Sequence, residues 1–196
     1  EAMDAMSLKC AQELSDAHVD VMGYACLVAI MSMGRGYHCV SEVNLHQETV
    51  VNDFPTPIVT SAGALINGLK VLGAKQISII TPYMRPLTDM VVDYIENQGI
   101  KVKQSIALEI PDNLEVAAQN SMNLLEIYKQ LDLTDVDVLV ASACVQMPSL
   151  EAIDLIQAEC GIPVTSAAVC TTYEMMKKLG IEAKSAIGGE LLSGKY

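Results

Sequence analysis

The sequence has no tryptophan, one phenylalanine and only two arginines, and each scarcity narrows what the protein can be. With so few aromatic rings, the core of this 196-residue chain must be filled by aliphatic side chains, including its 11 methionines. Acidic residues outnumber basic ones by 24 to 12, which gives a net charge of −12. Nucleic acids and anionic membrane surfaces bind through lysine and arginine, so this balance argues against both as partners.

The six cysteines are too few and too scattered for the disulfide framework of a small secreted protein, so we expect a cytoplasmic protein. No two cysteines have the C-x-x-C spacing of structural zinc sites. His38, Cys39 and His46 have no further ligand at a useful spacing, so we predict no metal site and place these histidines in a solvated loop. The longest apolar stretch, around residues 21–33, is too short and too interrupted to cross a bilayer.

Helix-like and strand-like segments alternate along the chain. Helices are predicted at residues 2–14, 86–99, 113–131, 150–159 and 171–179, with a further helix that ends at Leu72-Gly73. Strands are predicted at residues 19–25, 57–60, 77–81, 101–108, 136–141 and 163–165. The stretch 34–56 is predicted to be mostly loop. Strands that alternate with helices indicate an α/β fold, in which helices cover parallel sheets.

The same order of motifs occurs twice. LSDAHVDV (14–21) matches LDLTDVDV (131–138), and each leads into an apolar run that ends in Ala-Cys, at Cys26 and Cys144. PIVTSAGALINGLKVLG (57–73) then resembles PVTSAAVCTTYEMMKKLG (163–180). We therefore predict two pseudo-symmetric lobes, each a parallel sheet flanked by helices, with the active site in the cleft between them. The first lobe is assigned to residues 1–73 with 168–196 and the second to 74–167.

Both cysteines are predicted at carboxyl ends of strands, where open α/β sheets bind their ligands, and just before the next predicted helix. Facing lobes would bring Cys26 and Cys144 to one cleft from opposite sides. Backbone N–H groups and the dipole at a helix start stabilise a thiolate. A single Ala-Cys is more simply explained as a buried core residue, but the repeated corner favours a catalytic role.

Two polar residues are predicted on the rim of the same cleft. Tyr83 follows the strand at 77–81, and Asn113 stands between a strand and a helix, where it is equally suited to an N-cap. Both can donate hydrogen bonds to a carboxylate, together with N–H groups that follow the cysteines. No histidine stands beside either cysteine in the sequence, so protease-like triads are poorly supported.

The segments GYACLVAIM, SAGAL, TPYMRPLTD, EIPDN and SACVQMPSL together resemble the aspartate/glutamate racemase superfamily and, within it, the maleate cis–trans isomerases. The resemblance extends over essentially the whole chain. Amino-acid racemases of the superfamily usually have Asn-Thr after the first cysteine and Thr after the second, whereas Leu-Val and Val-Gln follow here. Arylmalonate decarboxylases keep only one of the two cysteines.

The resemblance implies an isomerase that needs no cofactor and converts maleate, a small dicarboxylate, into fumarate through a covalent cysteine adduct. It implies Cys26 as the nucleophile and Cys144 as the proton donor and acceptor. It also matches Tyr83 and Asn113 to ligands of the substrate carboxylates. The residues whose backbone would line the substrate site are Leu27, Val28, Val145 and Gln146.

The same resemblance implies a homodimer and a role in nicotinate degradation. The family begins with a further strand and helix, including an asparagine that holds the substrate. This chain lacks that segment and Glu1 already falls within a predicted helix, so we expect an upstream part to be missing. Two alternatives stay open: an aspartate or glutamate racemase that uses both thiols as acid and base, and a non-catalytic protein that binds small acids on the same scaffold.

Overall fold

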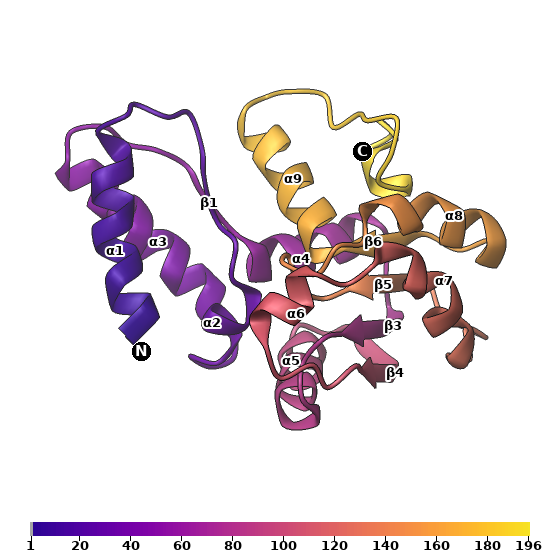
Figure 1. Cartoon of the computed structure of the whole chain (residues 1–196). Coiled ribbons are helices and arrows are strands. Elements are labelled where there is room, and N and C mark those ends of the chain that lie inside the picture. The colour runs from indigo at the N-terminus through magenta and orange to yellow at the C-terminus, as the bar shows by residue number, and fades with distance from the viewer. Residues whose placement is uncertain (1) are drawn as a thin grey trace.

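The computed structural model describes residues 2–196, in which helices alternate with parallel strands (Figure 1). The α-helices are α1 (Ala2–Ser15), α2 (Leu27–Met31), α3 (Tyr37–Val51), α4 (Ser61–Val71), α5 (Arg85–Asn97), α6 (Asn113–Ala117), α7 (Leu124–Ile127), α8 (Leu150–Cys160) and α9 (Ala167–Lys178). The strands are β1 (Met22–Tyr24), β2 (Ile58–Thr60), β3 (Gln76–Thr81), β4 (Lys101–Ala107), β5 (Val138–Ser142) and β6 (Val164–Ser166). Short 3-10 helices are η1 (Ser121–Asn123), η2 (Tyr128–Gln130) and η3 (Glu190–Leu192). Glu1, which the sequence places in the first helix, lies outside the described residues.

The strands form two parallel sheets, which confirms the predicted α/β fold. One sheet pairs β1 with β2, and the other has the order β4-β3-β5-β6. In each sheet the strand that leads to an Ala-Cys pair lies beside the strand of the Val-Thr-Ser-Ala motif. Tyr24 is in register with Thr60, and Ser142 is in register with Ser166. The repeat in the sequence is therefore also a repeat of structure.

Helices α4 and α9 follow the equivalent strands β2 and β6, and they pack against each other. Gly68 makes this close approach possible, because a Cβ atom there would lie 2.6 Å from the Cys170 sulfur. Helix α9 also contacts β1, β2 and β6, so it joins the two sheets. The main core is aliphatic and continuous, extending from Leu65 on α4 to Leu139 on β5.

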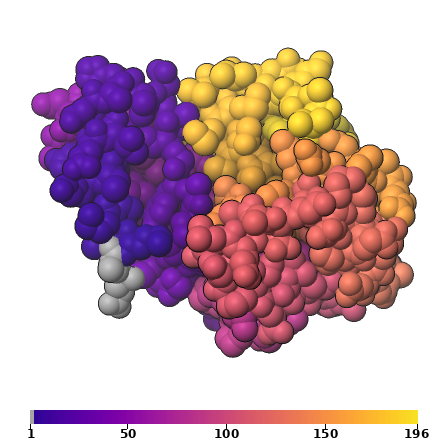
Figure 2. Space-filling model, viewed as in Figure 1, coloured from indigo at the N-terminus to yellow at the C-terminus, as the bar shows by residue number. Residues whose placement is uncertain are grey.

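The space-filling view shows the N-terminal helices, in indigo, meeting the C-terminal segment above and the residues around α6 below (Figure 2). A second, smaller cluster of buried residues lies within that N-terminal part, formed by Ala11, Met22, Leu45 and Ile58. Among the helices of residues 2–196, none combines the length and the apolar character needed to cross a bilayer.

The prediction of a loop over residues 34–56 is wrong, because most of that stretch forms α3. His38, Ser41, Leu45 and Thr49 are buried along one side of the helix, which packs against α1. Their spacing of three or four residues is helical, but only Leu45 is apolar. A buried face made largely of polar side chains concealed the helix from a hydrophobic pattern.

The predicted helix over residues 113–131 is interrupted. It forms the two short helices α6 and α7 with 3-10 turns around α7. The break occurs near Asn120, whose side chain accepts a hydrogen bond from the Met122 backbone N–H at 3.0 Å. An asparagine that bonds to the backbone two residues ahead favours a turn over a continuing helix.

Candidate active site

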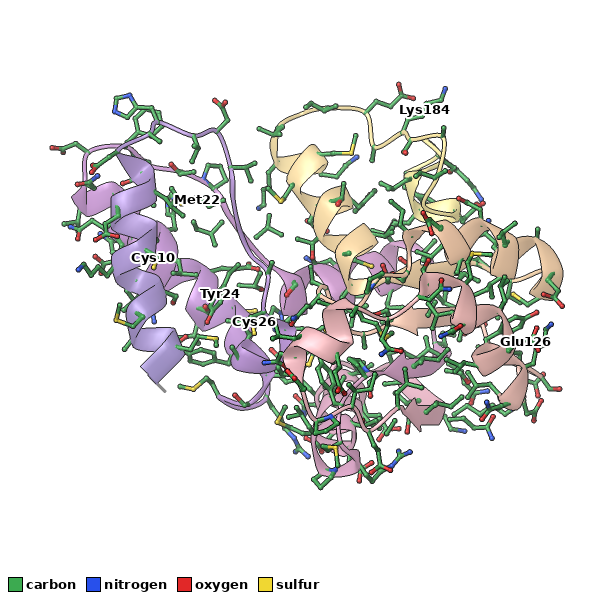
Figure 3. The ribbon with its side chains drawn as sticks, viewed as in Figure 1. Cys10, Met22, Tyr24, Cys26, Glu126 and Lys184 are labelled. Carbon is green, nitrogen blue, oxygen red and sulfur yellow. The ribbon has the colours of Figure 1, made fainter. Side chains whose placement is uncertain are left out.

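Cys26 lies where the N-terminal part of the molecule meets the rest, beyond Met22 and Tyr24 along the chain (Figure 3). It is two residues past the end of β1 and is the N-cap residue of α2, so the predicted strand–cysteine–helix corner is confirmed. No side chain caps α2, and the N–H groups of its first turn have no partner within the helix. The N–H groups of Leu27 and Val28 belong to this first turn, and the Cys26 thiol beside them is partly exposed.

Cys144 lies two residues past β5 and is only 6% exposed. The helix predicted over residues 150–159 is confirmed as α8, which begins at Leu150 and is separated from Cys144 by a loop. Pro148 keeps the end of this loop from being helical, since a proline disfavours helical backbone at the residue before it. The intervening loop leaves N–H groups unused: within residues 2–196, neither the Val145 nor the Gln146 backbone N–H donates a hydrogen bond.

Tyr83 contacts the residue before Cys144, and both Cys144 and Cys26 influence its pKa. It follows β3, and its hydroxyl donates a hydrogen bond to the Ala143 carbonyl oxygen at 3.2 Å, next to Cys144. Burial raises the pKa of Tyr83 well above its usual range, and the nearby sulfur atoms of Cys144 and then Cys26 raise it further. The phenol therefore stays protonated at neutral pH and can donate a hydrogen bond.

Asn113 is the first residue of α6, but Asp112 is the N-cap, since its side chain accepts from the Leu114 backbone N–H at 2.8 Å. The alternative explanation of Asn113 as a helix cap is therefore wrong. The Gln146 side chain donates to the Asn113 carbonyl oxygen at 2.7 Å. This contact joins the loop after Cys144 to the start of α6, so the structure brings Asn113 and Gln146 together on the Cys144 side.

A second set of polar groups lies on the α1 side of Cys26. The Tyr37 hydroxyl donates to an Asp4 carboxylate oxygen at 2.6 Å, and burial, followed by the charges of Cys26 and Asp4, raises the pKa of Tyr24. A cavity of about 250 Å³ opens beside Cys26 here. Its lining comprises Met3, Asp4, Cys26, Val28, Ala29, Ser32 and Leu87 and does not reach Cys144.

The prediction that His38 lies in a solvated loop is wrong. His38 is buried on α3, at 7% exposure. Its Nδ1 lies 2.5 Å from the Tyr94 hydroxyl oxygen. Cys170 is also fully buried, which raises the pKa of its thiol to about 12 and leaves it unreactive at neutral pH. Across residues 2–196, no three or more His, Cys, Asp and Glu side chains converge as a metal site would require.

Ser142, which was not among the predicted site residues, is the residue that most directly supports Cys144. Its hydroxyl donates to the Cys144 carbonyl oxygen at 2.8 Å and accepts from the Cys144 backbone N–H at 3.3 Å. Ser142 is completely buried. The available signal was a serine two residues before a cysteine at the end of a strand. The prediction considered only polar residues on the cleft rim, and Ser142 is not one of them.

Comparisons with known proteins agree with this geometry. A family model described as arylmalonate decarboxylase matches residues 5–192. A maleate isomerase of Pseudomonas putida is 55% identical over 195 residues, which cover 100% of this chain and 78% of that relative. A crystal structure of the maleate isomerase Iso from Pseudomonas putida S16, a cysteine-to-alanine variant with maleate, superposes with a TM-score of 0.98. It is 57% identical, and the match covers 99% of this chain and 78% of that one.

A second solved structure bears on the chemistry. It is the maleate cis–trans isomerase of Nocardia farcinica, in a cysteine-to-serine variant with a covalently bound succinylcysteine intermediate. Its TM-score is 0.94 at 38% identity, with 100% of this chain and 80% of that chain covered. In that relative, a cysteine forms a covalent bond to a four-carbon diacid.

Proposed function

We propose that this chain converts maleate into fumarate by covalent cysteine catalysis. It belongs to the maleate isomerases, within the family of the arylmalonate decarboxylase model. The observation that supports this most directly is the position of Tyr83, a partly buried phenol whose hydroxyl donates to the Ala143 carbonyl oxygen next to Cys144 and whose pKa is raised by burial and by both cysteines. Two thiols beside one neutral hydrogen-bond donor are what addition to an unsaturated dicarboxylate requires.

In the proposed mechanism, the Cys26 thiolate adds to C2 of maleate and the electrons of the double bond move to C3. The Cys144 thiol protonates C3, so the bond between C2 and C3 becomes single and rotates. Cys144, now a thiolate, removes the proton from C3, the double bond re-forms and the Cys26 thiolate leaves with its electron pair. Replacing rotation about a double bond by addition, rotation and elimination is the gain from covalent catalysis.

The substrate's two carboxylates need donors on both sides. The N–H groups of Leu27 and Val28 at the start of α2 would serve one carboxylate, and those of Val145 and Gln146, which have no partner in residues 2–196, would serve the other. Tyr83 and the Asn113 side chain would complete the set. During addition, negative charge develops at C3 and in the carboxylate that C3 bears, where such prepositioned donors lower the barrier.

The lobe assignment, residues 1–73 with 168–196 against 74–167, belongs to the same proposal. It is supported by the contacts of α9 with α4, β1 and β2. A cytoplasmic homodimer that acts in nicotinate degradation without a cofactor is also proposed, from the resemblance alone. Light scattering after size exclusion would test the dimer, since a monomer mass would contradict it.

Proton NMR of maleate with the full-length protein in D₂O tests the function. The wild type is expected to produce fumarate, Cys26→Ala neither fumarate nor a covalent adduct, and Cys144→Ser no turnover. Cys39→Ser, which removes an exposed thiol outside the proposed site, is the matched control and should keep full activity.

Fumarate formation by Cys26→Ala would contradict the nucleophile assignment. Unchanged maleate with the wild type, together with deuterium entering the α-position of aspartate or glutamate, would favour the racemase. Binding of maleate that survives loss of either cysteine, without any turnover, would favour the non-catalytic binding protein.

A further inference from the structure

We infer that Ser142 is the positioning residue of the proton-transferring cysteine: it binds both backbone polar groups of Cys144 and so leaves the Val145 and Gln146 amides for the substrate. This inference rests on the proposed function for its catalytic consequence. Its structural content, namely which amides are occupied, stands without it.

The Ser142 hydroxyl is a reciprocal partner of a single residue. It donates to the Cys144 carbonyl oxygen at 2.8 Å and accepts from the Cys144 N–H at 3.3 Å. All three groups are buried, with Ser142 at 0% and Cys144 at 6% exposure. Water cannot replace the hydroxyl easily there, so its loss would leave two buried backbone groups unsatisfied.

The backbone of Ala143, between Ser142 and Cys144, is also held at both its N–H and its carbonyl group. The Ala143 N–H donates to the Ile80 carbonyl oxygen at 2.9 Å, and the Ala143 carbonyl accepts from Tyr83 at 3.2 Å. The pairing of β5 with β6 shifts register between Val140 and Ser142. The chain therefore leaves the regular sheet at Ser142, and hydrogen bonds of Ser142 and Ala143 then fix the direction of the Cys144 thiol.

The first corner of the repeat has no such serine. Tyr24-Ala25-Cys26 corresponds to Ser142-Ala143-Cys144, so a tyrosine occupies the position of Ser142. The hydroxyl that supports this corner comes from the start of α4, because Ser61 donates to the Tyr24 carbonyl oxygen at 3.3 Å. Only the corner assigned to proton transfer, where the thiol must meet C3 twice per turnover, has the internal serine bridge.

Occupying the Cys144 N–H also selects the substrate's donors. With that amide bound to Ser142, the next N–H groups along the loop, those of Val145, Gln146 and Met147, are without partners in residues 2–196. The Gln146 side chain holds this loop through the Asn113 carbonyl at 2.7 Å. The loop thus has adjacent free N–H groups, and Val145 and Gln146 are the first of them after Cys144, which suits a carboxylate.

The kinetic test compares Ser142→Ala with Ser78→Ala in the full-length protein. Ser78 is the matched control, because it is also completely buried on a strand but its hydroxyl has no partner in residues 2–196. Ser142→Ala is expected to lower kcat roughly tenfold while KM changes less than about twofold, since misplacing a reacting group slows the chemical step. Ser78→Ala should match the wild type in both constants.

An unchanged kcat in folded Ser142→Ala, in a preparation whose wild type isomerises maleate, would overturn the inference. Equal losses in KM and kcat, or equal effects of the two variants, would overturn it too. A wild type without isomerase activity would instead contradict the proposed function.

Amide hydrogen exchange in the wild type, followed by NMR, tests the structural part and needs no variant that might fail to fold. The Cys144 amide is expected to exchange slowly and the Val145 and Gln146 amides rapidly. Saturating succinate, a dicarboxylate without a double bond to attack, should slow the latter two. A Cys144 amide that exchanges as fast as Val145, or no protection by succinate, would overturn the inference.

Discussion

His38 is a histidine that the fold keeps neutral. Its backbone N–H donates to the Tyr94 hydroxyl oxygen at 3.1 Å, and its Nδ1 lies 2.5 Å from the same oxygen. Burial lowers the pKa of His38 below its ordinary value of 6.5; Glu42 opposes this shift and Lys70 adds to it. At the scale of one residue, burial on α3 therefore favours the neutral form of an imidazole that the sequence placed in solvent.

This predicts a pH effect on stability. Because the pKa of His38 is lower in the folded state, its contribution is fully present above pH 6.5 and is lost as the pH falls below that value. Urea unfolding between pH 7.5 and pH 5 should show the free energy of unfolding falling more steeply for the wild type than for His38→Gln, which cannot titrate. Parallel pH profiles for the two proteins would contradict the assignment.

At the scale of elements, the contact between α4 and α9 depends on one missing side chain. An added Cβ at Gly68 would lie 2.6 Å from the Cys170 sulfur and 3.1 Å from a Leu191 methyl carbon. Both neighbours are completely buried, so neither can move into solvent. The small size of Gly68, rather than its backbone freedom, is what this pair of helices requires.

Gly68→Ala is expected to lower the free energy of unfolding by about 1–3 kcal/mol, the usual effect of overpacking a core. Cys170→Ala removes the obstructing sulfur, so the double variant should recover part of that loss. Thermal or urea unfolding of both single variants and the double variant gives the coupling between the sites. Simple addition of the two single effects would mean that the sulfur is not the obstacle.

At the scale of the whole molecule, α5 is joined to α3 and to the residues just before it by two contacts between residues more than 50 positions apart. Arg35, which precedes α3, forms a two-pronged ion pair with Asp93 on α5, and His38 on α3 contacts Tyr94, the next residue of α5. The ion pair is exposed, whereas Tyr94 is 1% exposed. Neighbouring residues on one helix thus offer a comparison between a solvated and a buried link.

Tyr94→Phe is expected to lower the free energy of unfolding by about 1–3 kcal/mol, because it leaves two buried groups of His38 without a partner. Asp93→Asn should have little effect, and that effect should shrink further in high salt, since exposed ion pairs are screened. Urea unfolding of both variants at low and high salt is the measurement. A larger loss for Asp93→Asn would reverse this view of what joins α3 to α5.

The sequence by itself determined the alternation of helices and strands, the duplication, and the position of both cysteines at the carboxyl end of a strand. These features are local: periodicity, turn residues and repeated motifs act over a few residues. The errors arose where local signals were incomplete. The buried side of α3 is mostly polar, and a turn at Asn120 interrupts the helix predicted over residues 113–131.

Only the tertiary structure decided how the candidate site is built. Tyr83 meets Ala143 across 60 positions of sequence, and Gln146 meets Asn113 across 33. The occupied amide of Cys144 and the partnerless amides of Val145 and Gln146 follow from where the chain leaves the β5 ladder. Such facts depend on distances between separate elements, which packing sets and no short stretch of sequence encodes.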